Sequence, residues 1–245
     1  PPLDRFWTPF LNPARQILVF LPGRDRLFMP RRRLAELAEA AKSGSNQITL
    51  PLLRDEFRVV PNAQMSVQNF RAAVAIASFL GQRGQTARFR LVAEVTADEV
   101  RQSSVILVGA YENPWATDLS RNLRYYFESD GEANEEVCWI RDRNSGGEPK
   151  WIVRKLWPYG PQEVDYAIVN RTISRSNGQV VISLAGMNGF GTQAAAESIT
   201  SPEFWHEFAA AAPEGWEKKN LQVVLELRVI RDIPHPPKIV AIHAW

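Results

Sequence analysis

The sequence predicts an α/β fold, a mixed β-sheet with helices on its faces and two Rossmann-like halves, and three observations lead to this prediction. Residues 89–127 alternate strand and helix patterns, which is typical of parallel β-α-β units. Residues 135–174 hold three extended segments too close together for helical crossovers, which favours antiparallel pairing. Two apolar strands, one in each half, end in glycine and lead through a polar loop into a helix. We therefore predict a single α/β domain over 1–245, with halves of approximately 1–130 and 131–245.

In the first half, short β-branched apolar runs predict strands, and apolar residues spaced by three or four predict helices. Gln16–Leu21 is such a strand, and it is closed by the turn residues Pro22 and Gly23. Ser66–Gln82 is a helix that ends in a glycine-containing segment, and Thr96–Glu99 has the capping-box pattern of a helix start. The remaining first-half predictions are helices over Arg31–Lys42 and Ala116–Phe127, strands over Phe89–Val95 and Ser104–Gly109, and an extended or loop segment over Ile48–Leu53.

In the second half, turn residues separate a series of extended segments. Asn177-Gly178 is a strong hairpin turn pattern between two of them. Ser201 and Pro202 fit the cap and the first position of a helix. The predicted strands are Glu135–Arg143, Lys150–Trp157, Asp165–Ser174, Gln179–Gly186, Leu221–Ile230 and Lys238–Trp245, and the predicted helices are Thr192–Ile199 and Pro202–Ala211.

Composition excludes several classes of protein. The chain has 245 residues, 45% of them hydrophobic, with 8 Trp, 12 Phe and 5 Tyr, so it is not a disordered chain. With 29 Lys and Arg against 27 Asp and Glu the net charge is +2, which argues against a nucleic-acid partner. The only cysteine, Cys138, can form neither an internal disulfide nor a thiolate metal site, and we predict that it is buried and unreactive. The 3 His residues have no metal-ligand spacing, so no metal and no cofactor are predicted.

The amino-terminal segment and the apolar runs bear on how the chain is anchored and what it contacts. No apolar run reaches the roughly 18–20 residues of a membrane span. The opening Phe6-Trp7-Thr8-Pro9-Phe10 is already rich in aromatic residues, as a domain cut from a longer protein would be. It also supplies an apolar segment with which the domain could dock on a protein partner.

Two strand–loop–helix corners carry the candidate ligand-binding residues. The first corner runs from Gly109 through Asn113 to Thr117, and the second runs from Gly186 to Thr192. In each corner the unpaired amides of a helix start lie at the carboxyl end of a buried strand, where they favour an anion or a carbonyl oxygen. The candidate residues are Gly109, Asn113, Gly186, Asn188, Gly189, Gly191 and Thr192. In the alternative interpretation, the glycines only turn the chain and the threonines only cap helices.

A family resemblance rests on five stretches spread over nearly the whole chain. They are Phe6–Phe10, Ser104–Asn113, Asp165–Val169, Ala185–Ala195 and Lys218–Val224. Together they resemble the C-terminal domain of uncharacterised bacterial proteins with an N-terminal helical DNA-binding-like region and a single membrane span. The resemblance implies a membrane-tethered sensor or binding module, and it assigns neither an activity nor site residues.

Three hypotheses for the function remain open at this stage. The first is a non-enzymatic ligand-binding or sensory module whose ligand is small and polar or anionic, because the corners offer backbone donors and no convergent catalytic set accompanies them. The second is an enzyme that acts on a small polar or nucleoside-like substrate in the same crevice, with Glu112 or Glu197 as base. The third is an assembly module that docks through the aromatic amino-terminal segment.

Overall fold

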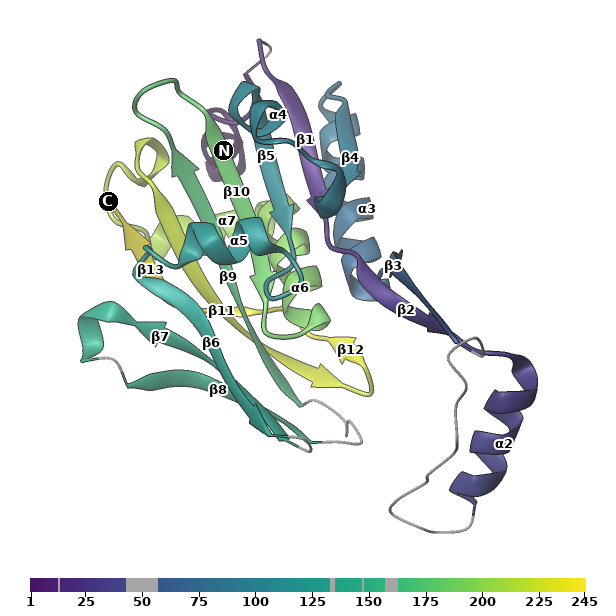
Figure 1. The fold of residues 1–245 in the computed structure, drawn as a ribbon. Coiled ribbons are helices and arrows are strands. Elements are labelled where there is room, and N and C mark those ends of the chain that lie inside the picture. The colour runs from purple at the N-terminus through teal and green to yellow at the C-terminus, as the bar shows by residue number, and fades with distance from the viewer. Residues whose placement is uncertain (13, 43–56, 133–134, 147, 157–162) are drawn as a thin grey trace. The chain divides into compact units, whose positions relative to one another are not determined.

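A computed structural model describes the chain except for residues 13, 43–56, 133–134, 147 and 157–162 (Figure 1). Contacts within the chain divide it into two compact units: unit 1 comprises Pro1–Pro22 and Ser66–Trp245, and unit 2 comprises Gly23–Met65. In unit 2, strands β2 (Arg24–Phe28) and β3 (Arg58–Gln64) form an antiparallel pair, and helix α2 spans Arg31–Ala41. The predicted segment Ile48–Leu53 lies outside the described residues.

Unit 1 is built on an eight-stranded mixed sheet, which confirms the predicted mixed α/β architecture. Its order is β12-β11-β9-β10-β5-β1-β4, with β13 paired to β11. Strands β4, β1, β5 and β10 are parallel neighbours, whereas the pairs of β9 with β10 and of β11 with β9, β12 and β13 are antiparallel. The strands span Gln16–Leu21 (β1), Ala87–Leu91 (β4), Ser103–Val108 (β5), Val164–Ile173 (β9), Val180–Gly186 (β10), Leu221–Ile230 (β11), Ile233–Pro234 (β12) and Lys238–Ala244 (β13). Both β5 and β10 are internal strands, as the sequence predicted.

Different elements cover the two faces of this sheet (Figure 1). Helices α1 (Pro2–Trp7), α3 (Val67–Gln82), α6 (Gly189–Thr200) and α7 (Pro202–Ala211) pack on one face. Helices α4 (Ala97–Gln102) and α5 (Pro114–Ser120) pack on the other face, together with a three-stranded antiparallel sheet of β6 (Tyr125–Glu132), β7 (Glu135–Asp142) and β8 (Pro149–Leu156). None of the described helices could span a bilayer, the longest being α3 with 16 residues.

The order of the parallel strands creates a point where the chain reverses direction across the sheet. From β1 the chain passes through unit 2 and α3 to β4 on one side of β1, and then through α4 to β5 on the other side. The carboxyl ends of β1 and β5 therefore flank a topological switch point, the place where open α/β sheets usually bind ligands.

The core under α1 and α7 contains the aromatic residues of the amino-terminal segment. Phe6, Trp7 and Phe10 are fully buried there, so these rings lie inside the chain's own core. The fully buried Arg171 donates hydrogen bonds to the carbonyls of Phe6, Trp216, Glu217 and Lys219 at 2.8–3.1 Å. Burial lowers the pKa of its guanidinium to about 10, so the group remains charged at neutral pH.

The core under the three-stranded sheet confirms the predicted burial of Cys138. Its side chain is fully buried and packs with Ile140 against the large sheet. Burial also raises the pKa of the thiol, which lowers its thiolate fraction at neutral pH. The unreactivity expected of Cys138 stays a prediction.

Two predicted elements were wrong in their extent. The helix predicted over Ala116–Phe127 ends at Ser120, and Tyr125 begins strand β6. Pairing of β6 with β7 and the Gln222 side chain, which bonds both backbone groups of Tyr125, override the local helical pattern there. The strand predicted over Phe89–Val95 is β4, which ends at Leu91 and is followed by a single 3₁₀ turn.

Candidate functional site

The structure brings the two corners together at one edge of the large sheet. Strands β5 and β10 are parallel neighbours in which Val108 lies opposite Leu184, so both end at the same edge. The amide of Gly109 donates to the Leu184 carbonyl at 2.9 Å, which ties the start of the first corner to β10. We call this the carboxyl edge. It is also the edge at which the switch point between β1 and β5 lies.

In the second corner, the carboxylate of Asp165 binds the backbone amides that the sequence predicted would bind an external anion. Asp165, at the start of β9, is fully buried. Its carboxylate accepts hydrogen bonds from the amides of Gly191 at 2.6 Å, Tyr166 at 2.8 Å and Asn188 at 3.1 Å. The backbone amides of Asn188 and Gly191, two of the candidate ligand-binding residues, thus already donate within the chain.

Tight packing around Asp165 explains two of the glycines in this corner. A Cβ on Gly186 would lie 2.5 Å from the Asn188 carbonyl oxygen, and one on Gly191 would lie 2.7 Å from the Tyr166 carbonyl oxygen. Neither glycine has a positive φ, so steric space and not left-handed backbone requires them. Thr192 completes the turn because its hydroxyl accepts from the Gly186 amide at 3.1 Å.

Gly189 is packed less rigidly than the other two glycines of the second corner. It also has a φ outside the positive range. A Cβ there would lie 2.9 Å from the side chain of Gln68 at the start of α3, which can move aside.

Burial has the largest effect on the ionisation of Asp165. It raises the pKa of this carboxyl to about 6, although the three amide hydrogen bonds favour the ionised form. The group therefore carries most of a negative charge at neutral pH and becomes neutral in mild acid. An anionic ligand approaching the second corner at neutral pH would meet this charge.

The first corner is held by its own side chains. Asn113 is fully buried, and its side-chain amide donates to the Val108 carbonyl at 2.9 Å and accepts from the Ala116 amide at 3.3 Å. Thr117 donates to the Ala110 carbonyl at 3.2 Å. Gly109 has a φ of +92°, which a residue with a side chain rarely adopts. These contacts fit the structural interpretation of Gly109 and Asn113.

A pocket opens beside the first corner, on the face of the sheet covered by α5 and β6. The space in it that a water-sized molecule can occupy is about 20 Å³. The lining residues are Ala110, Tyr111, Ala116, Thr117, Ser120, Phe127 and Ala185. Most of them are small or aromatic, and the hydroxyls of Thr117 and Ser120 supply polar groups. This volume is far below that of a typical ligand pocket, so a ligand of more than a few atoms requires the lining side chains to move.

Ionisable groups gather around Tyr111 at the rim of this pocket. The Tyr111 hydroxyl donates to the Glu128 carbonyl at 3.1 Å, and burial raises its pKa well above the ordinary value. The Lys155 ammonium lies 5.7 Å from the centre of the Tyr111 ring and 3.3 Å from the Glu136 carboxylate. Among the described residues, no group of three or more His, Cys, Asp and Glu side chains could hold a metal ion.

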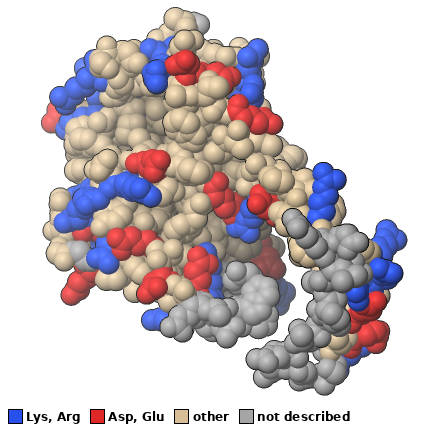
Figure 2. Space-filling view, in the orientation of Figure 1, with Lys and Arg blue, Asp and Glu red and all other residues tan. Residues whose placement is uncertain are grey.

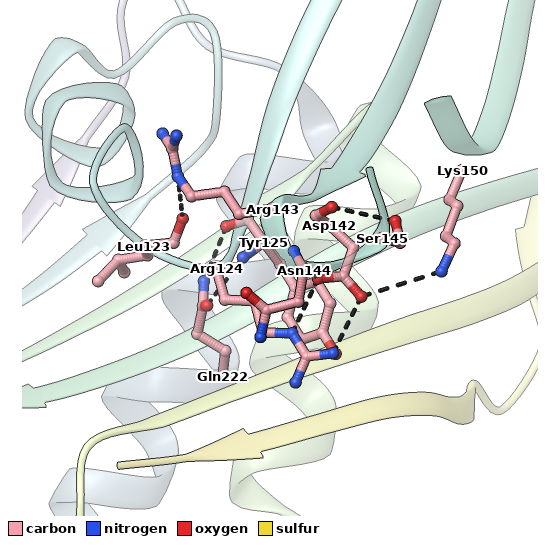
Figure 3. Close-up of polar contacts among 9 residues, drawn as sticks. All are labelled: Leu123, Arg124, Tyr125, Asp142, Arg143, Asn144, Ser145, Lys150 and Gln222. Carbon is pink, nitrogen blue, oxygen red and sulfur yellow. Dashed lines mark hydrogen bonds and ion pairs between the residues drawn. The ribbon is translucent and has the colours of Figure 1, made fainter. Parts of the chain in front are cut away.

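A second polar cluster fixes the start of β6 (Figure 3). Arg124 forms a two-pronged ion pair with the buried Asp142, at 2.8 and 3.0 Å. The Arg124 guanidinium, with the Asn144 amide, holds the pKa of Asp142 below its usual value. Gln222 of β11 points at the backbone of Tyr125, which it binds at 2.8 and 2.9 Å. These contacts attach the three-stranded sheet to the large one.

A row of polar side chains crosses the large sheet beneath this attachment. Ser183 of β10 lies opposite Asn170 of β9, which lies opposite Gln222 of β11. All three are buried. None of the three is among the predicted site residues, although a polar residue among inward-facing apolar positions of a strand is the pattern that could have identified them. Asp165 is also absent from the predicted site residues, because two of its partners come from the second corner and not from its own strand.

The acids of the enzyme hypothesis do not line the pocket. The Glu112 carboxylate accepts from the Asn69 side chain at 3.4 Å, and Glu197 is exposed and accepts from the Gln193 side chain at 2.8 Å. Charged side chains of both signs are interspersed over the face seen in Figure 2.

Comparisons with known proteins do not place the chain in a family. No family model matches it, and searches of curated proteins and of solved structures find no match either. The resemblance to the C-terminal domain of membrane-tethered bacterial proteins stays a prediction.

Proposed function

We propose that this chain is a non-enzymatic ligand-binding or sensory module that holds a small polar ligand at the carboxyl edge. The observation that carries the proposal is the small pocket beside the first corner, lined by Tyr111, Phe127, Thr117, Ser120 and small residues. It lies where parallel strands end near a topological switch point. Glu112 and Glu197 lie outside its lining, which favours binding over catalysis.

The contacts of Asp165 refine the kind of ligand that we propose. Because this carboxylate already accepts from the Gly191 and Asn188 amides, the second corner supports the pocket and does not itself bind an anion. A neutral polar molecule avoids repulsion from this buried charge. The pocket lining favours a compact ligand with an apolar or aromatic body.

The finer fold and the cellular setting are parts of the same proposal. We infer that the Rossmann-like relation between the halves is limited to the two strand–corner–helix units, β5 with α5 and β10 with α6, because β9, β11 and β13 are antiparallel. We also propose that the domain belongs to a membrane-tethered bacterial protein. The support for the tether is the sequence resemblance.

A thermal-shift screen of neutral and charged metabolites tests the binding proposal. A ligand at one hundred times its Kd stabilises the native state by about 2.7 kcal/mol, a rise of several degrees in Tm for a chain of this size. Ala185→Val should fill the pocket floor and reduce the shift. Ala87→Val, at the start of edge strand β4, is the matched control and should leave it unchanged. Equal shifts in wild type and Ala185→Val would contradict this site.

A further inference from the structure

Two buried polar side chains that lie side by side have hydrogen-bonding atoms without a partner. Ser183 is fully buried and Asn170 is 1% exposed. Neither the Ser183 hydroxyl nor the Asn170 side-chain nitrogen has a hydrogen-bond partner among the described residues. Opposite residues on paired strands have Cβ atoms roughly 5 Å apart, so one small group can contact both. Unpartnered groups of this kind are rare in protein interiors and call for an occupant.

Neighbouring contacts fix which way Asn170 presents its amide. The Gln222 nitrogen donates to the Asn170 oxygen at 2.8 Å, and Gln222 is itself held by both backbone groups of Tyr125 (Figure 3). The Asn170 oxygen is thus committed to Gln222, and its NH₂ group is left with donors to offer. The Ser183 hydroxyl can donate or accept beside it.

This pair lies on the same face of β10 as the floor of the pocket. Ala185 lines the pocket, and Ser183 is the next residue along β10 that points to that face. On this face, Val181 of β10 packs with the cluster under α5, and Ile168 of β9 packs with the cluster under β6–β8. Ser183 and Asn170 lie between these two clusters, and we call this pair the seam.

We propose that the seam is the inner end of the ligand site, where Ser183 and Asn170 bind a neutral carbonyl or hydroxyl oxygen of a small ligand whose apolar body lies against Tyr111 and Phe127. This inference rests on the proposed binding function and names its ligand class. The Asn170 NH₂ group and the Ser183 hydroxyl both donate to such an oxygen. A carboxylate is disfavoured, because the buried Asp165 lies at the same edge of the sheet.

Benzamide is a probe with the required neutral carbonyl on an aromatic body, and benzoate is its charged counterpart. We expect benzamide to bind the full chain more tightly than benzoate or toluene in an NMR titration. Ser183→Ala and Asn170→Asp should each weaken benzamide binding by roughly three- to tenfold, the effect of losing one net hydrogen bond. Because the Ser183 hydroxyl has no partner among the residues that the structure describes, Ser183→Ala should not lower the Tm of the ligand-free protein.

Ser104→Ala is the matched control for Ser183→Ala. Ser104 is equally buried in the neighbouring strand β5, but its hydroxyl donates to the Phe10 carbonyl at 3.1 Å. Its removal should lower the Tm and leave the affinity for benzamide unchanged. A Ser183→Ala variant that melts at a lower temperature, with unchanged affinity, would show that this hydroxyl has a structural partner and would overturn the inference.

The remaining outcomes separate this inference from the proposed function. If Ala185→Val weakens benzamide binding and Ser183→Ala does not, the pocket is a ligand site but the seam is not its inner end. If Ala185→Val has no effect, the pocket itself is not the site. If wild type binds no benzamide, and one ordered water bridges Ser183 and Asn170 in a crystal structure, the seam holds structural water only and the inference fails, whereas the binding function still rests on the metabolite screen.

Discussion

Asp165 shows how a single residue changes what a helix start can bind. The amides at the start of α6 have the geometry of an anion site, and in this chain the anion is the carboxylate of Asp165 itself. A buried carboxylate with these donors holds the start of β9 and the second corner together. The same contacts leave the second corner with fewer donors for a ligand than its sequence suggests.

The ionisation of Asp165 predicts a dependence of stability on pH. Its pKa is about 6 in the folded protein, against an ordinary value of 3.8. Between about pH 4 and 6 the folded protein keeps a proton that the unfolded chain has released, so the free energy of unfolding falls as pH rises through this window. The expected loss is roughly 3 kcal/mol. Asp165→Asn cannot ionise, and urea unfolding of both proteins from pH 4 to pH 7 should show the loss in wild type only.

Asp142→Asn provides a control of opposite sign. Arg124 lowers the pKa of Asp142, so its contribution to stability is present above the unfolded-state pKa and is lost as pH falls through the lower, folded-state value. Asp142→Asn should therefore reduce the loss of stability in acid and leave the pH 4–6 window unchanged. If the free energy of unfolding of Asp165→Asn also falls between pH 4 and pH 6, a group other than Asp165 causes the fall.

Individual site residues could be predicted only where their role is local in sequence. Asn113 and Thr117 cap and close a corner within a few residues of chain, and their position at a helix start was visible in the pattern. Asp165, Ser183 and Asn170 acquire their roles from partners on another strand or corner. A polar residue within an apolar strand is a visible pattern, but one segment alone does not show what that residue contacts.

At the scale of elements, the second corner depends on glycines that leave room for other backbone atoms. Gly186→Ala would place a methyl group 2.5 Å from the Asn188 carbonyl oxygen. Relief of this contact requires the backbone to move, which is costly in a packed region. We expect a loss of about 3 kcal/mol in the free energy of unfolding. Gly178→Ala is the control: its φ of +67° costs about 1 kcal/mol, but a Cβ there meets open space. Equal losses in urea denaturation would contradict this packing.

Element prediction succeeded where periodicity and caps agree. The helix capped by Ser66 and the capping box at Thr96 are both present, and the hairpin of β7 and β8 is antiparallel as expected. It failed between Ser120 and Tyr125, where a helical pattern gives way to a strand. The decisive contacts come from Gln222, about 100 residues later, and tertiary contacts of this kind override local preference.

At the scale of the whole molecule, unit 2 is attached to unit 1 by two chain segments that lie next to each other. Arg24 pairs with Gln64, so the two ends of unit 2 are about 5 Å apart. Unit 2 enters the chain between β1 and α3. The prediction of one domain over 1–245 did not separate unit 2 from unit 1.

The closeness of its ends predicts that unit 2 can be removed without unfolding unit 1. Replacement of residues 25–63 by a Gly-Ser linker of about four residues should leave a chain that melts cooperatively, since a short linker can join paired strand ends at little entropic cost. Circular dichroism with a thermal melt checks this expectation. A deletion variant that shows no cooperative transition would mean that unit 1 depends on unit 2 for its fold.

The mixed sheet could be predicted from the sequence, but the location of the site could not. The alternation of strands and helices predicted parallel pairing, and the crowded middle predicted antiparallel pairing. Which strands become neighbours is decided by side-chain burial over the whole chain. The pocket exists because β6 returns over β10 beside α5, and this packing has no local pattern.

A crystal structure of the full chain soaked with benzamide tests the central claim most directly. We expect the aromatic ring against Tyr111 and Phe127, and the carbonyl oxygen within about 3 Å of the Ser183 hydroxyl and the Asn170 nitrogen, a normal hydrogen-bond distance. Benzamide bound at any other place, with the pocket and seam filled by protein atoms or water alone, would contradict the claim that a small neutral ligand binds at the carboxyl edge.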